Sequence, residues 1–366
     1  MKFGIISLEG DSSRNVLAEA GKLFDRADSF DIRKLELHAS NDGLQVLYQG
    51  KHLEKYDCVY IRGSYKYALL QRAITRALSH DTYLPLAPKA FTLGHDKLLT
   101  LLELQRNGVH IPKTYFAATT ALAKQILKEV QYPIIMKIPS GTQGKGVMMA
   151  DSANAAQSML DALEVFKQPY IIQEFVDTDA TDLRVIVAGD EVIAAMKRVG
   201  SKEDFRANIH LGAKGEKHNV DSDVERAAVK AARAIGAEIC AVDLLEGNKT
   251  SVIEVNLSPG LKGIAAATGE NIAAKVAKFL HSRTLQFKKE IGGTGFKEMM
   301  KNIGVSESKK DVQEIIGPLN VKAGIIKLPK VVTDISKFHT DEDVLILASK
   351  GKVEIKKYNI KKEEKE

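Results

Sequence analysis

Two carboxylates and one amide are spaced so that they can converge near residue 250. Two apolar runs flank residues 246–249, where a Gly-Asn pair predicts the turn of a β-hairpin. In such a hairpin Asp243 lies opposite Glu254, and Asn256 shares one face of its strand with Glu254. Oxygen ligands without His or Cys suit Mg²⁺ shared with phosphate better than zinc. The residues alone leave open a plain polar hairpin with one carboxylate in solvent.

A lysine followed by a glycine-rich loop is the second candidate site. Lys137 ends an apolar run, and residues 140–146 after it contain three glycines. Backbone N–H groups in such a loop can approach phosphate oxygens closely. The loop lacks the Gly-Lys-[Ser/Thr] spacing of a Walker loop and the acidic residue of a Rossmann fingerprint. A flexible surface hairpin is the alternative that the residues leave open.

A strand end at residues 173–176 is the third candidate site. Its sequence, Gln-Glu-Phe-Val, runs into the acidic segment 177–179. Backbone N–H and C=O groups at such a junction can pair with the edge of an adenine, while apolar side chains cover its faces. Taken alone, the segment is equally an ordinary strand end.

Charged residues between these segments could serve a phosphate. They are Asp182, Arg184, Lys197, Arg198 and Arg206, with Asn208 beside the last of them. Arg206 is the natural candidate to neutralise a transferring phosphate or an acyl-phosphate. For each residue singly, solvated surface charge is the alternative.

Alternating strand and helix patterns must position these residues. Residues 1–88 predict a small α/β unit with a parallel sheet: strands at 3–8 and 56–62, and helices at 14–24 and 67–78. A linking helix is expected at 96–106. Farther along, the patterns predict strands at 133–138 and 170–176, a strand pair at 185–197, and helices at 153–166 and 224–235. This mixture favours an α+β fold over one doubly wound sheet.

The last 80 or so residues differ in composition from the rest of the chain. Residues 285–366 contain seventeen Lys, no Arg and thirteen Asp plus Glu, so they carry +4 of the net charge of +6. Lysine of this kind, mixed with acids, is more typical of a solvated surface than of a nucleic-acid reader. A linker at 292–295, a short helix at 296–303, small strands within 321–358 and a disordered end at 361–366 are expected.

Length and cysteine content limit the class of protein. A chain of 366 residues predicts two or three domains, each able to bury a core without disulfides. Cys58 and Cys240 lie in apolar runs and are expected to be buried thiols in a reducing compartment, so the predicted location is the cytoplasm. No apolar run approaches the length of a membrane helix, and the first residues do not read as a signal peptide.

Taken in order, these motifs resemble those of the ATP-grasp superfamily, and among its branches the RimK-type α-L-glutamate ligases. The similar segments are TLGHDK at 92–97, GTQGKGV at 141–147, QEF at 173–175, DFRAN at 204–208 and EVNLSPG at 254–260. The resemblance covers residues 1–284. It implies an ATP-grasp fold made of an α/β domain at 1–88 and an ATP-grasp domain at 89–284. Within the latter, a central lid subdomain is expected at about 113–180 and a metal-binding subdomain at about 181–284; residues 285–366 remain as a linker and a small, basic, β-rich domain.

The resemblance also implies the roles of individual residues. The nucleotide would be bound by Lys97, Lys137, Gly144, Lys145, Gly146, Gln173, Glu174, Phe175, Val176, Asp182, Arg206 and Asn208. Lys137 and Arg206 would also act in catalysis, and Asp243, Glu254 and Asn256 would ligate one or two Mg²⁺ or Mn²⁺ ions. His95 and His210 are interpreted as structural.

The activity implied is an ATP-dependent ligation of a carboxylate to an amine through an acyl-phosphate. The segment after Asn256 favours L-glutamate as the amine, and the acceptor would be a protein C-terminus or a cofactor carboxylate. An acidic partner would fit the cations Arg62, Lys197, Arg198 and Lys202, which are equally ordinary surface residues. A ligase for another amino acid and a nucleotide-regulated RNA- or ribosome-binding module are the alternatives. Direct nucleic-acid or membrane binding is not expected, and a homo-oligomer remains open.

Overall fold

The structure of the protein is a computed structural model. It describes residues 1–41, 43–139, 146–200 and 214–291, and then residues 320–322, 325–328, 332, 336, 344–349 and 352–357. The chain divides into two compact units, Met1–Met299 and Met300–Glu366. Each unit is described by itself.

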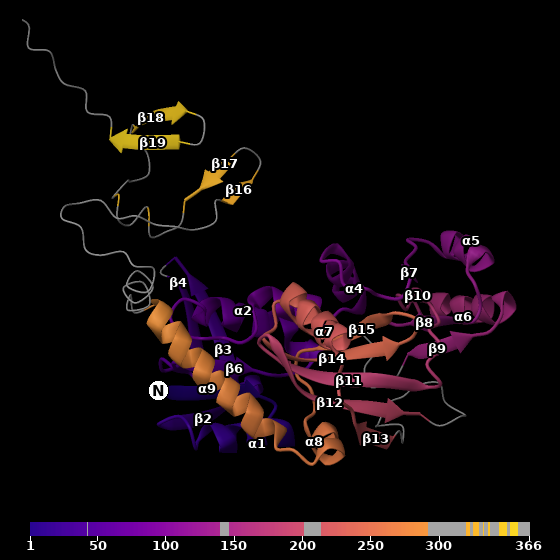
Figure 1. Ribbon diagram of the computed structural model, residues 1–366, viewed down its shortest axis with the longest axis horizontal. Coiled ribbons are helices and arrows are strands. Elements are labelled where there is room, and N and C mark those ends of the chain that lie inside the picture. Colours follow the sequence, from indigo (N-terminus) through magenta and orange to yellow (C-terminus); the bar gives the residue numbers. More distant parts are fainter. Residues whose placement is uncertain are drawn as a thin grey trace, which may run out of the picture. The chain divides into compact units, whose positions relative to one another are not determined.

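The first unit begins with a three-stranded parallel sheet, as the alternation of strand and helix predicts (Figure 1). Its strands, in spatial order, are β2 (Arg26–Asp31), β1 (Lys2–Ser7) and β6 (Cys58–Ile61). Apolar side chains of β1 and β6 are fully buried, and helix α1 (Asp11–Ala20) packs against the long helix α9 (Ile272–Ile291). A small antiparallel sheet, which the sequence patterns did not resolve, lies between β2 and β6 in the chain: β3 (Leu35–Ser40), β4 (Gly43–Tyr48) and β5 (Lys51–His52).

Three helices lead from this sheet into the rest of the unit. They are α2 (Ala68–Leu78), α3 (Pro88–Leu93) and α4 (Lys97–Arg106). The short 3-10 turn η2 (Tyr65–Tyr67) directly precedes α2, and another, η1 (Ile32–Lys34), follows β2. Asp96 caps α4 by accepting a hydrogen bond from the N–H of Leu99 at 2.9 Å. Gly94, between α3 and α4, packs so closely on Leu257 that an added Cβ would lie 2.8 Å from its Cγ. The helix that begins at Lys97 is therefore fixed against the residue next to Asn256.

A four-stranded antiparallel sheet follows and has a hydrophobic core of its own. The spatial order is β7 (Thr114–Tyr115), β10 (Ile171–Glu174), β8 (Ile134–Lys137) and β9 (Val147–Ala150). Helices α5 (Thr120–Glu129) and α6 (Ala153–Val165) supply Leu127 and Leu160 to this core, which is separate from the main one. Independent burial of this kind is typical of a subdomain.

A five-stranded antiparallel sheet completes the first unit. In spatial order it contains β13 (Lys214–Lys217), β12 (Glu191–Val199), β11 (Thr181–Ala188), β14 (Ile239–Glu246) and β15 (Thr250–Asn256). Helix α7 (Ser222–Ile235) packs on β14 and β15, while α8 (Lys262–Thr268) contacts β12 and β13 (Figure 1). This sheet shares one continuous core with the N-terminal parallel sheet. The hairpin that carries the predicted metal ligands is thus part of a rigid, buried framework.

The second unit is described as two antiparallel hairpins. Strand β16 (Asn320–Lys322) pairs with β17 (Ile325–Lys327), and β18 (Val344–Ser349) pairs with β19 (Lys352–Lys357). These agree with the small strands expected in this region. The expected linker at 292–295, the helix at 296–303 and the end at 361–366 lie outside the described residues, and α9 continues past residue 284 to Ile291.

Two further expectations concern cysteines and membranes. Cys58 and Cys240 are buried free thiols, and burial raises the pKa of each to about 12. This agrees with the interpretation of inert thiols. Over the described residues, no helix has both the length and the apolar character needed to cross a membrane.

Candidate functional site

The hairpin β14–β15 places two carboxylates opposite each other. Asp243 pairs with Glu254 and Ala241 pairs with Asn256, as the sequence predicted. A β-bulge follows directly, because the pairing shifts by one residue between Asp243 and Leu244. Asp243 is only 4% exposed, whereas Glu254 and Asn256 are half-buried. The three oxygen-bearing side chains are therefore neighbours, and the carboxylate of Asp243 does not lie in solvent.

Asp243 belongs to a buried chain of four alternating charges. Arg184 donates to both carboxylate oxygens of Asp243, at 2.7 and 2.6 Å. Arg198 lies 3.0 Å from Asp243 and also donates to both oxygens of Asp182, at 2.5 and 2.6 Å. The two arginines and two aspartates come from the three adjacent strands β11, β12 and β14. Their formal charges cancel, which makes their burial tolerable.

Burial and nearby charges together shift the pKa values of the two aspartates in opposite directions. Burial alone would raise the pKa of Asp243, but the charges of Arg184 and Arg198 outweigh it and hold that pKa well below its ordinary value. Burial raises the pKa of Asp182 to about 6; Arg198 opposes this shift, and the charge of Asp243 adds to it. Asp243 is therefore an anion at neutral pH, as a metal ligand must be.

Replacing Arg198 with methionine should destabilise the protein strongly. Asp182 and Asp243 would then be buried without their shared cation, which costs roughly 3–5 kcal/mol of unfolding free energy. Urea denaturation of the variant measures this loss. Arg233→Met is the matched control, because the ion pair of Arg233 with Asp190 is exposed and contributes about 0–1 kcal/mol. Equal losses in the two variants would contradict the importance of the buried chain.

Lys137 is held at the end of β8 by side chains of neighbouring strands. Its Nζ donates to Gln173 Oε1 at 2.6 Å, and Gln173 Nε2 in turn donates to Thr114 Oγ1 at 2.8 Å. Burial lowers the pKa of Lys137 to about 8; the nearby negative charge of Glu254 opposes this shift, and the positive charge of Lys97 adds to it. These effects place Lys137, Lys97 and Glu254 within electrostatic range of one another. Both polar ends of the Gln173 side chain are therefore engaged by neighbouring side chains.

The strand end at residues 173–176 meets the turn of the β14–β15 hairpin. The backbone N–H of Glu174 donates to the carbonyl of Lys113 at 2.9 Å, and the Lys113 ammonium lies 3.4 Å from the Glu174 carboxylate. Phe175 and Val176 follow, both half-buried. A Cβ on Gly247 would lie 2.7 Å from Val176 Cγ1, so only glycine allows this close approach. The predicted adenine-binding segment and the predicted metal hairpin are thus in contact.

Several predicted site residues lie outside the described part of the chain. They are Gly144, Lys145, Arg206 and Asn208, together with His210 and Lys202. Gly146 is described: it adopts a φ of +75°, and its carbonyl accepts a hydrogen bond from the N–H of Ile138 at 2.9 Å. His95 has its Nε2 3.3 Å from Gln71 Oε1, and burial lowers its pKa, in keeping with a structural role.

The interpretation of Arg62 and Arg198 as surface cations is wrong. Both are buried, with exposed fractions of 5% and 4%. Lys197 lies on β12 with its ammonium 3.5 Å from the carboxylate of Glu246. Sequence reasoning also missed the partnership of Arg184 with Asp243. The sequence feature that could have indicated this ion pair is the position of Arg184 two residues after Asp182, which places both side chains on the same face of the strand.

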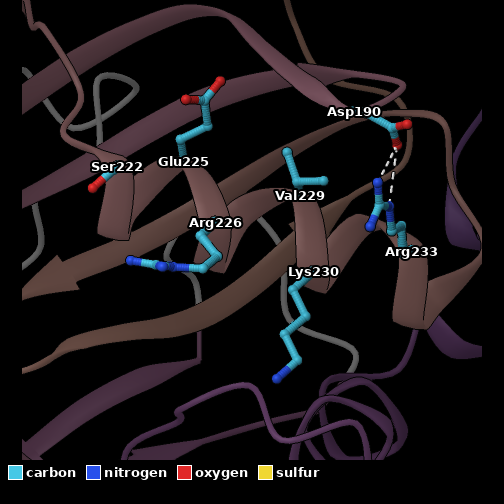
Figure 2. Close-up of a pocket in the computed structure, with 7 residues that line it drawn as sticks. All are labelled: Asp190, Ser222, Glu225, Arg226, Val229, Lys230 and Arg233. Atoms are coloured by element: carbon cyan, nitrogen blue, oxygen red, sulfur yellow. Dashed lines mark hydrogen bonds and ion pairs between the residues drawn. The ribbon is translucent and has the colours of Figure 1, made fainter.

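A charged pocket on the surface of α7 is separate from these residues. Figure 2 shows its lining: Asp190, Ser222, Glu225, Arg226, Val229, Lys230 and Arg233. Each of its cations already has a protein partner: Arg226 pairs with Asp223, Arg233 with Asp190, and Lys230 with the Gly108 carbonyl. None of the predicted site residues lines this pocket.

The donor set on β14 and β15 fits Mg²⁺ better than a transition metal. Within the described ranges, no group of three or more His, Cys, Asp and Glu side chains could hold a metal ion. A cation here would rely on two carboxylates and the Asn256 amide, with phosphate and water oxygens completing its shell. This is the usual way in which Mg²⁺ binds beside a nucleotide. The amide of Asn256 is oriented by the N–H of Ser258, which donates to Oδ1 at 3.0 Å.

Comparisons with known proteins point to one family. The model of the RimK-like ATP-grasp domain matches residues 94–280. The chain is 33% identical over 301 residues to a probable alpha-L-glutamate ligase of Marinomonas sp. (strain MWYL1), covering 81% of this chain and 100% of the relative. A probable alpha-L-glutamate ligase of Shewanella loihica is 34% identical over 289 residues, covering 77% and 96%.

Solved structures share the same fold. The ATP-grasp ligase PsnB, complexed with a minimal precursor, Mg and ADP, aligns with a TM-score of 0.61 at 18% identity, covering 77% of this chain and 98% of PsnB. A RimK domain protein from Sphaerobacter thermophilus aligns with a TM-score of 0.58 at 16% identity, covering 76% and 99%. The expected α+β ATP-grasp fold is confirmed. The chain therefore belongs to the RimK-like ATP-grasp family of ligases.

Proposed function

We propose that this ligase uses ATP and Mg²⁺ to join L-glutamate to a carboxylate acceptor through an acyl-phosphate. The observation that carries the proposal is the facing of Asp243 and Glu254 within electrostatic range of Lys137. Anionic oxygens and a lysine on two different sheets form a site for a cation and for phosphate at once.

The described residues divide into metal and nucleotide groups in this proposal. Asp243, Glu254 and Asn256 would hold one or two Mg²⁺ or Mn²⁺ ions, which when bound supply charge neutralisation for the phosphates. Lys97, Lys137 and Gly146 would contact the phosphates, while Glu174, Phe175 and Val176 would hold the adenine. Asp182 would complete the nucleotide site, and Gln173 would position Lys137. Gly144, Lys145, Arg206 and Asn208 are assigned to phosphate by their motifs alone.

The chemistry requires no side-chain nucleophile. An acceptor carboxylate oxygen attacks the γ-phosphorus of ATP, the bond to the β,γ-bridging oxygen breaks, and ADP leaves. The amino group of glutamate then attacks the acyl carbon, an amide bond forms, and phosphate leaves while the amine gives up its proton to solvent. Positioning and charge neutralisation are the main catalytic effects in such phosphoryl transfers.

The choice of glutamate and of a carboxylate acceptor has separate support. The two curated relatives are named probable alpha-L-glutamate ligases. The segment Leu257-Ser258-Pro259-Gly260 after Asn256 is the one whose resemblance to RimK-type ligases favours glutamate. PsnB was solved with its precursor peptide PsnA2, which favours a peptide chain as one class of acceptor. A cofactor carboxylate is the other class.

ADP release tests the proposal directly. The full chain is incubated with ATP, Mg²⁺ and L-glutamate, together with a panel of peptide and cofactor carboxylates, and the products are analysed by mass spectrometry. We expect ADP release that depends on glutamate, and a mass increase of one glutamyl residue for each addition. Turnover with lysine, arginine or aspartate in place of glutamate would identify a ligase for another amino acid.

Absence of turnover would point to a different class of protein. A nucleotide-regulated RNA- or ribosome-binding module would bind Mg²⁺·ATP yet release no ADP with any acceptor. Its partner binding should also weaken steeply as the salt concentration rises.

A further inference from the structure

The loop after β15 is attached to the carboxyl edge of the N-terminal parallel sheet. Three hydrogen bonds make this attachment: Arg62 Nη2 to the Pro259 carbonyl at 2.6 Å, the Gly63 N–H to Ser258 Oγ at 2.9 Å, and the Leu261 N–H to Ser12 Oγ at 2.8 Å. Ser258 also orients Asn256, as described above. The end of β6 therefore lies beside the predicted metal ligands, although the two are almost 200 residues apart in the sequence.

Arg62 places a positive charge at the end of β6, and no carboxylate of the described residues neutralises it. It is 5% exposed, and its guanidinium lies 5.3 Å from the ring centre of Tyr60. Its hydrogen-bond acceptors are both neutral: the Tyr60 hydroxyl at 3.1 Å and the Pro259 carbonyl at 2.6 Å. No carboxylate of the described residues forms an ion pair with it. Burying an uncompensated cation is costly, so such a residue usually has a counter-ion.

The buried arginines near the predicted metal site do have carboxylate counter-ions. Arg198 is as deeply buried as Arg62, but it contacts two aspartates, and Arg184 contacts one. Two carboxylates that follow a strand of the N-terminal sheet or end one, Asp11 at the start of α1 and Asp31 at the end of β2, pair with other arginines, Arg14 and Arg33. The missing negative charge is therefore not supplied by these two aspartates.

A buried side-chain donor of α2, beside the end of β6, has no acceptor within the described residues. Gln71 is completely buried, and within the described part of the chain its Nε2 has no hydrogen-bond partner. A Cβ on Gly63 would lie 2.6 Å from this nitrogen, so Gln71 lies directly against the residue that follows Arg62. Unsatisfied buried donors are rare and call for an explanation.

Arg62 and Gln71 lie at an edge of the sheet where a substrate would be expected to bind. Ligands of sheets with parallel strands bind at the carboxyl ends of the strands, and Arg62 follows the last residue of β6. Of the five N–H groups of its guanidinium, two have acceptors within the described residues, and a carboxylate can use the others as a planar pair. The loop that Arg62 contacts leads back within three residues to Asn256.

We propose that Arg62 binds the carboxylate of the acceptor substrate at the carboxyl edge of the N-terminal sheet. The acceptor thus supplies the counter-ion that Arg62 lacks, and its carboxylate is held beside the β15 loop, where the γ-phosphate is expected. The proposal rests on the proposed ligase function, and it names the part of the chain that recognises one of the two substrates. It also explains why this arginine is buried, whereas a general acidic partner would need exposed cations.

Substrate binding in variants of Arg62 tests this assignment. The probe is the α-linked dipeptide Glu-Glu, which carries acceptor carboxylates, and its binding to the full chain is measured by calorimetry with Mg²⁺ and a non-hydrolysable ATP analogue. Arg62→Gln should weaken dipeptide binding at least about tenfold, since a charge-assisted pair is lost. The affinity for the ATP analogue should stay unchanged. Arg62→Lys, which keeps the charge without the planar pair of donors, should give an intermediate loss.

Two outcomes would overturn the assignment. Unchanged dipeptide affinity in both variants would show that Arg62 does not bind the acceptor. An equal loss of dipeptide and ATP-analogue affinity would show that it only holds the β15 loop. Arg72→Gln is the matched control, because Arg72 is an exposed arginine on α2 whose Nη1 donates to Thr92 Oγ1 at 2.9 Å.

The binding experiment is independent of turnover. If wild-type protein releases ADP with glutamate while the Arg62 variants bind the dipeptide normally, the ligase proposal stands and the Arg62 assignment fails. If wild-type protein binds the dipeptide through Arg62 but releases no ADP, the binding site stands and the proposed reaction fails.

Discussion

Replacing Glu254 with glutamine is expected to lower ligase turnover at least about 100-fold. Mutating a residue that only orients a metal ligand typically lowers metal affinity or activity about 10–100-fold. Losing the charge of a ligand itself should therefore lower turnover by at least the upper end of that range. Glu254 lies opposite Asp243 and within electrostatic range of Lys137, so in the proposed site its charge would act on both the cation and the phosphates. ADP release measured over a range of Mg²⁺ concentrations should show a matching rise in the Mg²⁺ needed for half-maximal rate.

Glu246→Gln provides the matched control for this variant. Glu246 is on the same hairpin, but its carboxylate lies 3.5 Å from Lys197 and not beside Asp243. We expect its turnover and Mg²⁺ dependence to stay close to those of the unaltered protein. If both variants lost activity equally, the loss would reflect damage to the hairpin. If Glu254→Gln kept full turnover, Glu254 would not be a metal ligand.

ATP binding should weaken as the pH rises above 8, because of Lys137. Burial lowers the pKa of Lys137 from its ordinary value of 10.5 to about 8 in the free protein. Below that pH the ammonium is already charged. Above it the free protein has a neutral amine, and the phosphates of a bound nucleotide must restore the proton, so affinity falls by up to about tenfold per pH unit. Calorimetry at pH 8.5 in two buffers of different ionisation enthalpy should detect uptake of a proton.

The variant Lys137→Gln separates this effect from general pH dependence. It should bind ATP weakly at every pH and take up no proton at pH 8.5. Lys124→Gln is the control, because Lys124 is an exposed lysine of α5 that pairs with Asp161 at 2.8 Å. Proton uptake that persisted in Lys137→Gln would assign the titration to another group.

The same pKa shift affects folding in the opposite sense. Between pH 8 and 10.5 the unfolded chain holds a proton on Lys137 that the folded chain has lost. The free energy of unfolding therefore gains a contribution that increases with pH in this window. ATP affinity and protein stability should thus change in opposite directions, an unusual combination that points to a buried lysine kept for ligand binding.

Much of the candidate site was predictable because it depends on local geometry. The side chains of a strand alternate between its two faces, and the Gly-Asn turn sets the register of the hairpin. The predicted pairing of Asp243 with Glu254 is confirmed, although next to the turn Leu244 pairs with Val252 and a bulge then brings Asp243 opposite Glu254. The same local rules predicted the parallel N-terminal sheet, the helices α6 and α7, and the β11–β12 strand pair. The bulge after Asp243 was not predicted, because neither strand alternation nor the turn residues indicate where an extra residue enters a strand.

The sequence by itself determined which side chains lie along each strand, but the tertiary structure decided what surrounds them. Arg184 and Asp243 are 59 residues apart, Lys137 and Gln173 are 36 apart, and Arg62 and Pro259 are 197 apart. No periodicity brings such residues together, because their proximity results from packing sheets and helices into a shared core. Packing also decided burial: it encloses Arg62 and Arg198, and it lowers the pKa of Lys137 to about 8.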